Sequence, residues 1–245
     1  MNIQSVLTNL AASSWGTGLR KVVRASGLNH VVKQLFYSVK YEDEFQKVVS
    51  SCVREGDIVW DVGANVGVYT DIFLDAVGLR GRVVAFEPNP NACDVLEKKY
   101  GASQQFDLPR VALGDEDSEL LLSFSKEDSL DPMGSFVSEF ADRNQLPVKV
   151  ITPLQFVKDN PDLTPSFIKV DVEGFELAVL AGLRELFAIT PHARVVAIEV
   201  HVGILQSQGV KNPLAEVKTF LNSFGYTISL TDPSHIMGIK EKMSD

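Results

Sequence analysis

The sequence lacks the features of secreted, disulfide-bonded and membrane-spanning proteins. Its 245 residues include only two cysteines, Cys52 and Cys93. Neither belongs to a CxxC pair, so neither a disulfide framework nor a structural zinc site is expected. No apolar run approaches the roughly 20 residues that cross a bilayer, and the first residues have no basic segment typical of a secretory signal. We therefore expect a cytoplasmic protein without a membrane span.

Basic residues are also scarce. Lys and Arg number 23 against 32 Asp and Glu, which gives a net charge of −9 and a pI near 5.0. Nucleic acids and anionic membranes bind proteins through a basic surface that releases counterions, and the sequence has no cluster of that kind. We expect a small-molecule partner and no nucleic acid.

What the sequence does contain is an alternation of apolar strands and amphipathic helices. Strands rich in branched apolar residues are predicted at 58–62, 82–87, 167–172 and 194–200, and the clearest helices at 66–77, 91–100 and 175–187. Short apolar strands of this kind are covered on both faces. The alternation predicts an α/β fold with a doubly wound, mostly parallel sheet and right-handed crossovers.

The remaining segments are assigned around this sheet. A helix is predicted at 42–53, strands joined by loops at 106–151, and a C-terminal helix that stops at Gly225, followed by a hairpin that closes one sheet edge. We predict a helical appendage at residues 1–40 and a single α/β domain at 41–245.

A glycine-containing loop follows the first strand. Asp61, Gly63 and Gly67 form D-x-G-x-x-x-G at a strand-to-helix turn, with Ala64 and Asn65 between the glycines. Glycine allows a sharp turn close to a ligand, and the helix start offers amide donors. A dinucleotide site has a glycine where this chain has Asn65, so a diphosphate fits poorly. The loop therefore favours an adenosyl ligand without a diphosphate.

Glu87 stands at the end of the next strand, 20 residues after Gly67. A carboxylate at this position can accept hydrogen bonds from both hydroxyls of a ribose. The spacing of the loop and this acid supports a nucleoside-binding site.

Charged residues also end two later strands. Asp171 and Glu173 follow the strand at 167–172, and Glu199 and His201 end the strand at 194–200. Ligands of open α/β sheets bind at the carboxyl ends of the strands. We expect these four side chains to face one crevice and to be the catalytic candidates.

Lys169 and Glu176 are assigned structural roles. Lys169 is expected to be buried, and a buried ammonium needs a carboxylate partner, such as Asp61, Asp171 or Glu199. Glu176 is expected to interact with the dipole at the start of its helix.

The chain resembles the FkbM-type family of S-adenosylmethionine-dependent methyltransferases. The resemblance runs from about Tyr41 to Val202 and is carried by DVGANVGVYT, VVAFEPNP, VALGD, IKVDVEGFELAVLAGL and AIEVH in the order and spacing of the family. It implies a class I methyltransferase (Rossmann-like) fold, with a seven-stranded, mostly parallel sheet and an antiparallel C-terminal strand. It also implies transfer of a methyl group to an oxygen.

The resemblance implies roles for the loop. Gly63 and Gly67 would line the methionine and ribose of S-adenosyl-L-methionine, Asp61 would hold its amino end through the loop, and Glu87 would bind the ribose.

It further implies that Asn89 and Asp115 flank the adenine. The expected acceptors are hydroxyls of sugars and of polyketide-type natural products.

Methylation of an alcohol needs a base that takes its proton. His201, with an unperturbed pKa of about 6.5, is the first candidate and Asp171 the second. Glu199 is expected to orient the imidazole.

Three alternatives stay open. A divalent cation bound by Asp171, Glu173, Glu199 and His201 would make the transfer metal-assisted. The second alternative is a protein that binds the cofactor without catalysis. The third is a nicotinamide-dependent oxidoreductase, in which the same loop would bind a dinucleotide. The glycine spacing argues against the last of these.

Overall fold

The structure is a computed structural model that describes residues 45–124, 144–189, 193–230 and 233–240. The predicted appendage at residues 1–40 lies outside these ranges, and the domain division at residue 41 remains a prediction.

The central sheet confirms the predicted class I methyltransferase topology. Five neighbouring strands run parallel, the next strand is antiparallel to them, and the edge strand pairs antiparallel with that one. In spatial order the seven strands are β3 (Phe106–Asp107), β2 (Arg82–Phe86), β1 (Ile58–Val62), β7 (Phe167–Val170), β8 (Val195–Glu199), β10 (His235–Ile239) and β9 (Thr227–Leu230). The C-terminal hairpin thus closes one sheet edge, as predicted.

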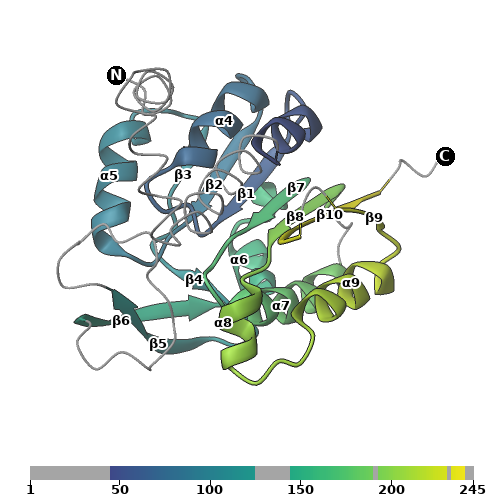
Figure 1. Ribbon diagram of the computed structural model, residues 1–245. Coiled ribbons are helices and arrows are strands. Elements are labelled where there is room, and N and C mark those ends of the chain that lie inside the picture. Colours follow the sequence, from purple (N-terminus) through teal and green to yellow (C-terminus); the bar gives the residue numbers. More distant parts are fainter. Residues whose placement is uncertain (1–44, 125–143, 190–192, 231–232, 241–245) are drawn as a thin grey trace, which may run out of the picture. The chain divides into compact units, whose positions relative to one another are not determined.

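One face of the sheet packs on three helices, α6 (Pro153–Asp159), α7 (Glu176–Ile189) and α9 (Pro213–Ser223). Trp60 and Ile168 belong to this core and are fully buried. Figure 1 shows the three helices together below the sheet. They form one outer layer of a three-layer α/β/α arrangement.

The opposite face packs on a helix at residues 45–52, on α4 (Val68–Val77) and on α5 (Pro90–Tyr100). Val59 and Phe167, the sequence neighbours of the residues that face the other core, point to this side and are fully buried. This alternation with period two explains why the strands are apolar along their whole length.

A second sheet lies in the segment that was predicted as strands joined by loops. It contains β4 (Ala112–Leu113), β6 (Asn144–Ile151) and β5 (Ser118–Phe124), in that spatial order. β4 pairs parallel with β6, and β5 pairs antiparallel with β6. The prediction identified strands here but not their separation from the main sheet.

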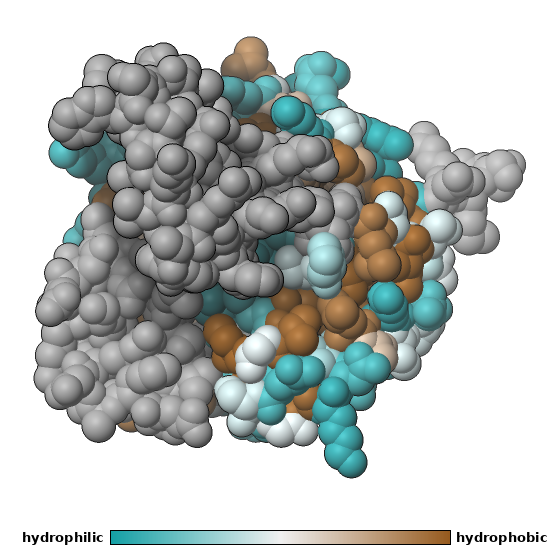
Figure 2. Space-filling view, in the orientation of Figure 1, coloured by the Kyte–Doolittle hydropathy of each residue, from teal (hydrophilic) through white to brown (hydrophobic). Residues whose placement is uncertain are grey.

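Figure 2 shows hydrophilic residues in a recess near the middle of the view, with hydrophobic residues beside it.

Among the helices of the described residues, none is long and apolar enough to cross a membrane.

Candidate active site

The loop between β1 and α4 is fixed against the neighbouring strands. The amides of Gly63 and Ala64 both donate to the carbonyl of Phe86, at 3.0 and 3.3 Å. Gly63 has a φ of +81°, and a Cβ there would lie 1.8 Å from the main-chain oxygen of Asp171. Glycine is required here because the loop touches the chain that follows β7. The predicted cofactor loop and the predicted acidic strand end are therefore in direct contact.

Gly67 serves the packing of the loop on α5. It precedes α4 with a φ of +88°, and a Cβ would lie 2.8 Å from side-chain atoms of both Leu96 and Tyr100. The Tyr100 hydroxyl donates to the Gly67 carbonyl at 3.0 Å. A side chain at position 67 would clash with buried side chains of α5, so a substitution there would disturb core packing.

Glu87 follows β2 and ties the loop to the second strand. Its carboxylate accepts hydrogen bonds from the amides of Asn65, at 2.7 Å, and Asn89, at 2.8 Å. Burial raises the pKa of Glu87 to about 7, although the two amides oppose this shift. Each carboxylate oxygen has a further lone pair that a ribose hydroxyl can use. The position suits the predicted ribose contact, which remains a prediction.

The two residues expected near the adenine differ in their surroundings. Asn89 is buried and caps α5 by accepting a hydrogen bond from the amide of Asn91 at 3.0 Å. Asp115 is exposed between β4 and β5. Neither position tests the adenine contact, which remains a prediction.

Lys169 is buried and paired, as predicted. Its Nζ lies 3.0 Å from Asp171 Oδ2 and 3.7 Å from Asp61 Oδ1, and it stands 4.4 Å from the centre of the Tyr69 ring. Burial disfavours the charge, but the two carboxylates outweigh it and raise the pKa of Lys169. Asp61 has no exposed surface and accepts a hydrogen bond from Thr70 at 2.7 Å. Asp61 is therefore held in the interior by Thr70 and Lys169, and its predicted role in holding the amino end of the cofactor remains a prediction.

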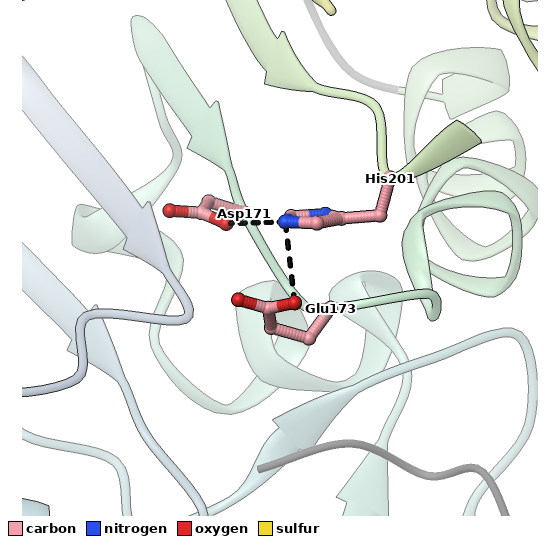
Figure 3. Close-up of side chains that lie close together, drawn as sticks. All are labelled: Asp171, Glu173 and His201. Carbon is pink, nitrogen blue, oxygen red and sulfur yellow. Dashed lines mark ion pairs between the residues drawn. The ribbon is translucent and has the colours of Figure 1, made fainter. Parts of the chain in front are cut away.

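His201 lies between β8 and α8 (Val202–Ser207), and its Nε2 faces the acidic strand ends (Figure 3). This nitrogen is 3.3 Å from Glu173 Oε2 and 3.9 Å from both Asp171 Oδ1 and Glu199 Oε1. The structure thus brings the four predicted catalytic candidates together at the carboxyl edge of the sheet.

The other imidazole nitrogen is bound by Glu176, for which the sequence predicted only an interaction with the helix dipole. His201 Nδ1 lies 2.6 Å from Glu176 Oε1, and Glu176 has no exposed surface. The same oxygen accepts a hydrogen bond from the Gly174 amide. Nδ1 is thus held by Glu176, whereas Glu199, the acid expected to orient the imidazole, lies on the Nε2 side. Glu176 also does more than interact with the helix dipole.

The surrounding carboxylates change the titration of His201. Burial disfavours its charged form, but the hydrogen bond to Glu176 and the charges of Glu173 and Asp171 outweigh burial and raise the pKa of His201 to about 9. Burial and the nearby acids also raise the pKa of Glu173 to about 7, against the effect of His201. The imidazole is therefore protonated at neutral pH, contrary to the expectation from its unperturbed pKa.

Glu173 reaches His201 through an unusual backbone conformation. Its φ is +47°, and Gly174 follows with a φ of +95°. A non-glycine residue in this region costs on the order of 1 kcal/mol and is found most often at functional sites. A Cβ on Gly174 would lie 2.4 Å from Ile204, so the turn is packed closely against α8.

Three donor atoms of Asp171, Glu173 and His201 lie within 4.8 Å of one another. Carboxylate and imidazole ligands suit divalent ions such as Mn²⁺ and Zn²⁺. This geometry is compatible with the metal-assisted alternative.

Comparison with known proteins agrees with the family that the motifs resemble. The sequence profile of the methyltransferase FkbM domain matches residues 61–228. The hexuronic acid methyltransferase AglP of Haloferax volcanii is 27% identical over 180 residues, which cover 72% of this chain and 69% of the relative. The 31-O-demethyl-FK506 methyltransferase FkbM of Streptomyces tacrolimicus is 27% identical over 206 residues, with 72% and 75% covered.

A solved structure is also similar. The methyltransferase FkbM of Methylobacillus flagellatus aligns with a TM-score of 0.48 and 18% identity, over 76% of this chain and 44% of that one. The family match covers more than half of the sequence and includes the glycine loop, His201 and the four acids nearest to it, Asp171, Glu173, Glu176 and Glu199. The chain belongs to the FkbM methyltransferase family.

Proposed function

We propose that the protein is an O-methyltransferase that acts on a hydroxyl group of a small molecule, with S-adenosyl-L-methionine as the methyl donor. The observation that carries this proposal is the contact between Gly63 and the main-chain oxygen of Asp171. This contact places the loop at residues 63–67 beside the chain that carries Asp171 and Glu173, which supports a common site for the donor and the acceptor.

The loop at residues 63–67 and Glu87 are the parts of the chain that would hold the donor. Amides at the start of α4 and the Glu87 carboxylate offer donors and acceptors to an adenosyl group. When bound, S-adenosylmethionine supplies a methyl group on a positively charged sulfur. The carboxylates of Asp171, Glu173 and Glu199 would attract that charge toward His201.

His201 would take the proton of the acceptor hydroxyl at Nε2, the nitrogen that faces the acidic strand ends. An alcohol is a weak nucleophile, and a positioned base contributes about 10²–10⁴-fold to such a reaction. Asp171 is the second candidate for this role. The chain also contributes alignment, because a displacement at carbon requires the acceptor to lie in line with the bond that breaks.

The names of the relatives favour two acceptor classes. One relative is a hexuronic acid methyltransferase and another acts on 31-O-demethyl-FK506. We therefore propose a hydroxyl of a sugar acid or of a polyketide-type natural product as the acceptor. A cytoplasmic location and a small-molecule partner, rather than nucleic acid, remain the predictions of the sequence.

The proposal is tested by incubating the protein with S-adenosylmethionine that carries a labelled methyl group and a panel of such compounds. Mass spectrometry should detect the labelled methyl on an acceptor oxygen. His201→Ala should lose about 10²–10⁴-fold in kcat while it retains affinity for S-adenosylhomocysteine. If His201→Ala remains fully active, the base is Asp171 or another group.

The cluster of Asp171, Glu173 and His201 donors supports a metal-assisted reaction as the second candidate. Extensive dialysis against EDTA separates the two mechanisms. Turnover that survives this treatment favours His201 as a base, and turnover that returns only with added Mn²⁺ or Mg²⁺ favours a metal. A protein that binds S-adenosylhomocysteine but methylates none of the acceptors would favour the alternative of a cofactor-binding protein without catalysis.

A further inference from the structure

Glu176 has the geometry of a residue that acts through His201. It is the first residue of α7 and has no exposed surface. Its Oε1 lies 2.6 Å from His201 Nδ1, across 25 positions of sequence. A first-turn acid that only interacts with the helix dipole needs no such partner and is normally solvated.

The burial of Glu176 requires positive charge or strong donors nearby. An ionised carboxylate is costly to bury unless it is paired and hydrogen-bonded. The hydrogen bonds that Glu176 makes with His201 and with the Gly174 amide both use Oε1. Oε2 is buried and has no hydrogen-bond partner among the described residues. The imidazole is therefore the main compensation for this buried carboxylate.

The contact also determines which nitrogen of His201 exchanges its proton. An ionised carboxylate only accepts hydrogen bonds, so Nδ1 must carry a hydrogen atom. Nε2 is then the nitrogen that gains and loses a proton. It is also the nitrogen that faces Asp171, Glu173 and Glu199 in the crevice.

We propose that Glu176 is the positioning residue of the general base: it holds the Nδ1–H tautomer of His201 and stabilises the imidazolium that forms during methyl transfer. This inference rests on the proposed function. In the step, the O–H bond of the acceptor breaks and its proton moves to His201 Nε2. The acceptor oxygen forms the new bond to the methyl carbon, and the electron pair of the broken carbon–sulfur bond stays on sulfur. Water then takes the proton from Nε2.

The charged groups around His201 come from several elements. Glu176 approaches from α7, Asp171 and Glu173 from the chain after β7, and Glu199 from the end of β8. The other oxygen of Glu199 lies 3.3 Å from His235 Nε2 on β10. Within the described ranges, Glu176 is the one acid that contacts Nδ1. Removal of the Glu176 carboxylate should therefore change the tautomer of His201. Removal of an acid on the Nε2 side, such as Glu173, should change only the pKa of His201.

The first test does not depend on turnover. Nitrogen NMR of the histidine side chains, with the His201 signals identified by comparison with His201→Ala, should show the Nδ1–H tautomer in the full-length protein above the titration midpoint. In Glu176→Ala, the neutral ring should become a mixture of both tautomers, and the midpoint should move toward lower pH. Glu173→Gln is the matched control, because it should lower the midpoint and leave the tautomer unchanged.

The second test uses the reaction. Glu176→Gln should lower kcat at least about 10-fold, but less than His201→Ala, for which a loss of about 10²–10⁴-fold is expected. The pH midpoint of kcat/KM should fall, while the dissociation constant of S-adenosylhomocysteine stays within about 2-fold. Glu176→Asp should recover part of the activity, since it keeps an acceptor near Nδ1.

The outcomes separate this inference from the proposed function. An unchanged tautomer in Glu176→Ala, in a variant that is folded by circular dichroism, overturns the positioning role. If Glu176→Ala does not fold, the same NMR measurement is made on Glu176→Leu, which has a similar volume and offers no acceptor to Nδ1, and an unchanged tautomer in that variant likewise overturns the positioning role. If the tautomer changes but no acceptor is methylated by the wild-type protein, the positioning role stands and the proposed reaction fails.

Discussion

At the scale of single residues, the protonation of His201 controls the proposed chemistry. The neighbouring carboxylates raise its pKa to about 9, so at neutral pH most of the free protein carries the imidazolium. Only the neutral ring can accept a proton, and its population increases as the pH rises through this value. A residue that is useful as a base is therefore held mostly in its conjugate acid form before the substrates bind.

We predict that kcat/KM increases with pH, with a midpoint near 9. This parameter reports ionisations of the free enzyme, in which the carboxylates around His201 are not yet opposed by a positively charged donor. The measurement is the pH profile of methyl transfer at low acceptor concentration. A midpoint near the ordinary histidine value, about 6.5, would show that the neighbouring carboxylates do not raise the pKa of His201 in the free protein.

Lys169 allows a second prediction at this scale. In Lys169→Met, the buried carboxylate of Asp61 loses its cation, so the free energy of unfolding at pH 7 should fall by about 3–5 kcal/mol. Lys99→Met is the control, because the pair between Lys99 and Asp71 is exposed and contributes about 0–1 kcal/mol. Urea denaturation of both variants measures the difference. Equal losses would show that the Lys169 pairs contribute no more than a surface ion pair.

The pH dependence of the Lys169→Met loss has a defined sign. Asp171 is paired with Lys169. Burial raises the pKa of Asp171, but the charges of Lys169 and His201 outweigh burial and hold this pKa below its ordinary value. A depressed acid contributes stability above its unfolded pKa, and that contribution is lost as the pH falls through the folded value. The part of the Lys169→Met loss that comes from the pair with Asp171 should therefore shrink as the solution is acidified below about pH 4.

At the scale of elements, the glycine loop depends on its packing against α5. Gly67→Ala places a Cβ 2.8 Å from side-chain atoms of Leu96 and Tyr100, at a φ of +88°. Gly209→Ala has a similar φ of +92° and no atom within 4 Å, so it measures the backbone strain alone.

We predict that Gly209→Ala lowers the free energy of unfolding by about 1–2 kcal/mol, and that Gly67→Ala lowers it by about 1–3 kcal/mol more through overpacking. Denaturant titration of the two variants gives the difference directly. Equal losses would mean that the loop is not packed against α5 as described.

The sequence predicted the elements better than the directions of single side chains. The strands at 58–62 and 82–87 were recognised because residues covered on both faces are apolar throughout. The second sheet was not separated from the first, since β4 has only the two residues Ala112–Leu113 and forms no pattern of its own.

The limits of the sequence are clearest in the site itself. Strand ends placed Asp171, Glu199 and His201 at one edge, and this part of the site was predictable from topology. Glu176 was assigned to a helix dipole because its position in the first turn does not reveal which way its side chain points. The packing of Gly67 against α5 was not predicted either, because the contact comes from residues about 30 positions later. Its expected contact with the cofactor remains a prediction.

At the scale of the whole molecule, ligand binding should stabilise the fold in a selective way. S-adenosylhomocysteine at 100 times its dissociation constant should add about 2.7 kcal/mol to the free energy of unfolding, and NAD should add none. Glu87→Ala should reduce the shift, since Glu87 is expected to bind the ribose and also holds the Asn65 amide of the loop. Thermal unfolding with each ligand tests this. A shift with NAD alone would favour an oxidoreductase.

The central claim is that the loop after β1 holds the donor with its reactive carbon toward the cluster of His201, Asp171 and Glu173. A crystal structure with S-adenosylhomocysteine tests this claim most directly. We predict that the ribose lies at Glu87 and that the sulfur lies on the side that faces His201 Nε2. A ligand bound elsewhere, or a sulfur that points away from the imidazole, would contradict it.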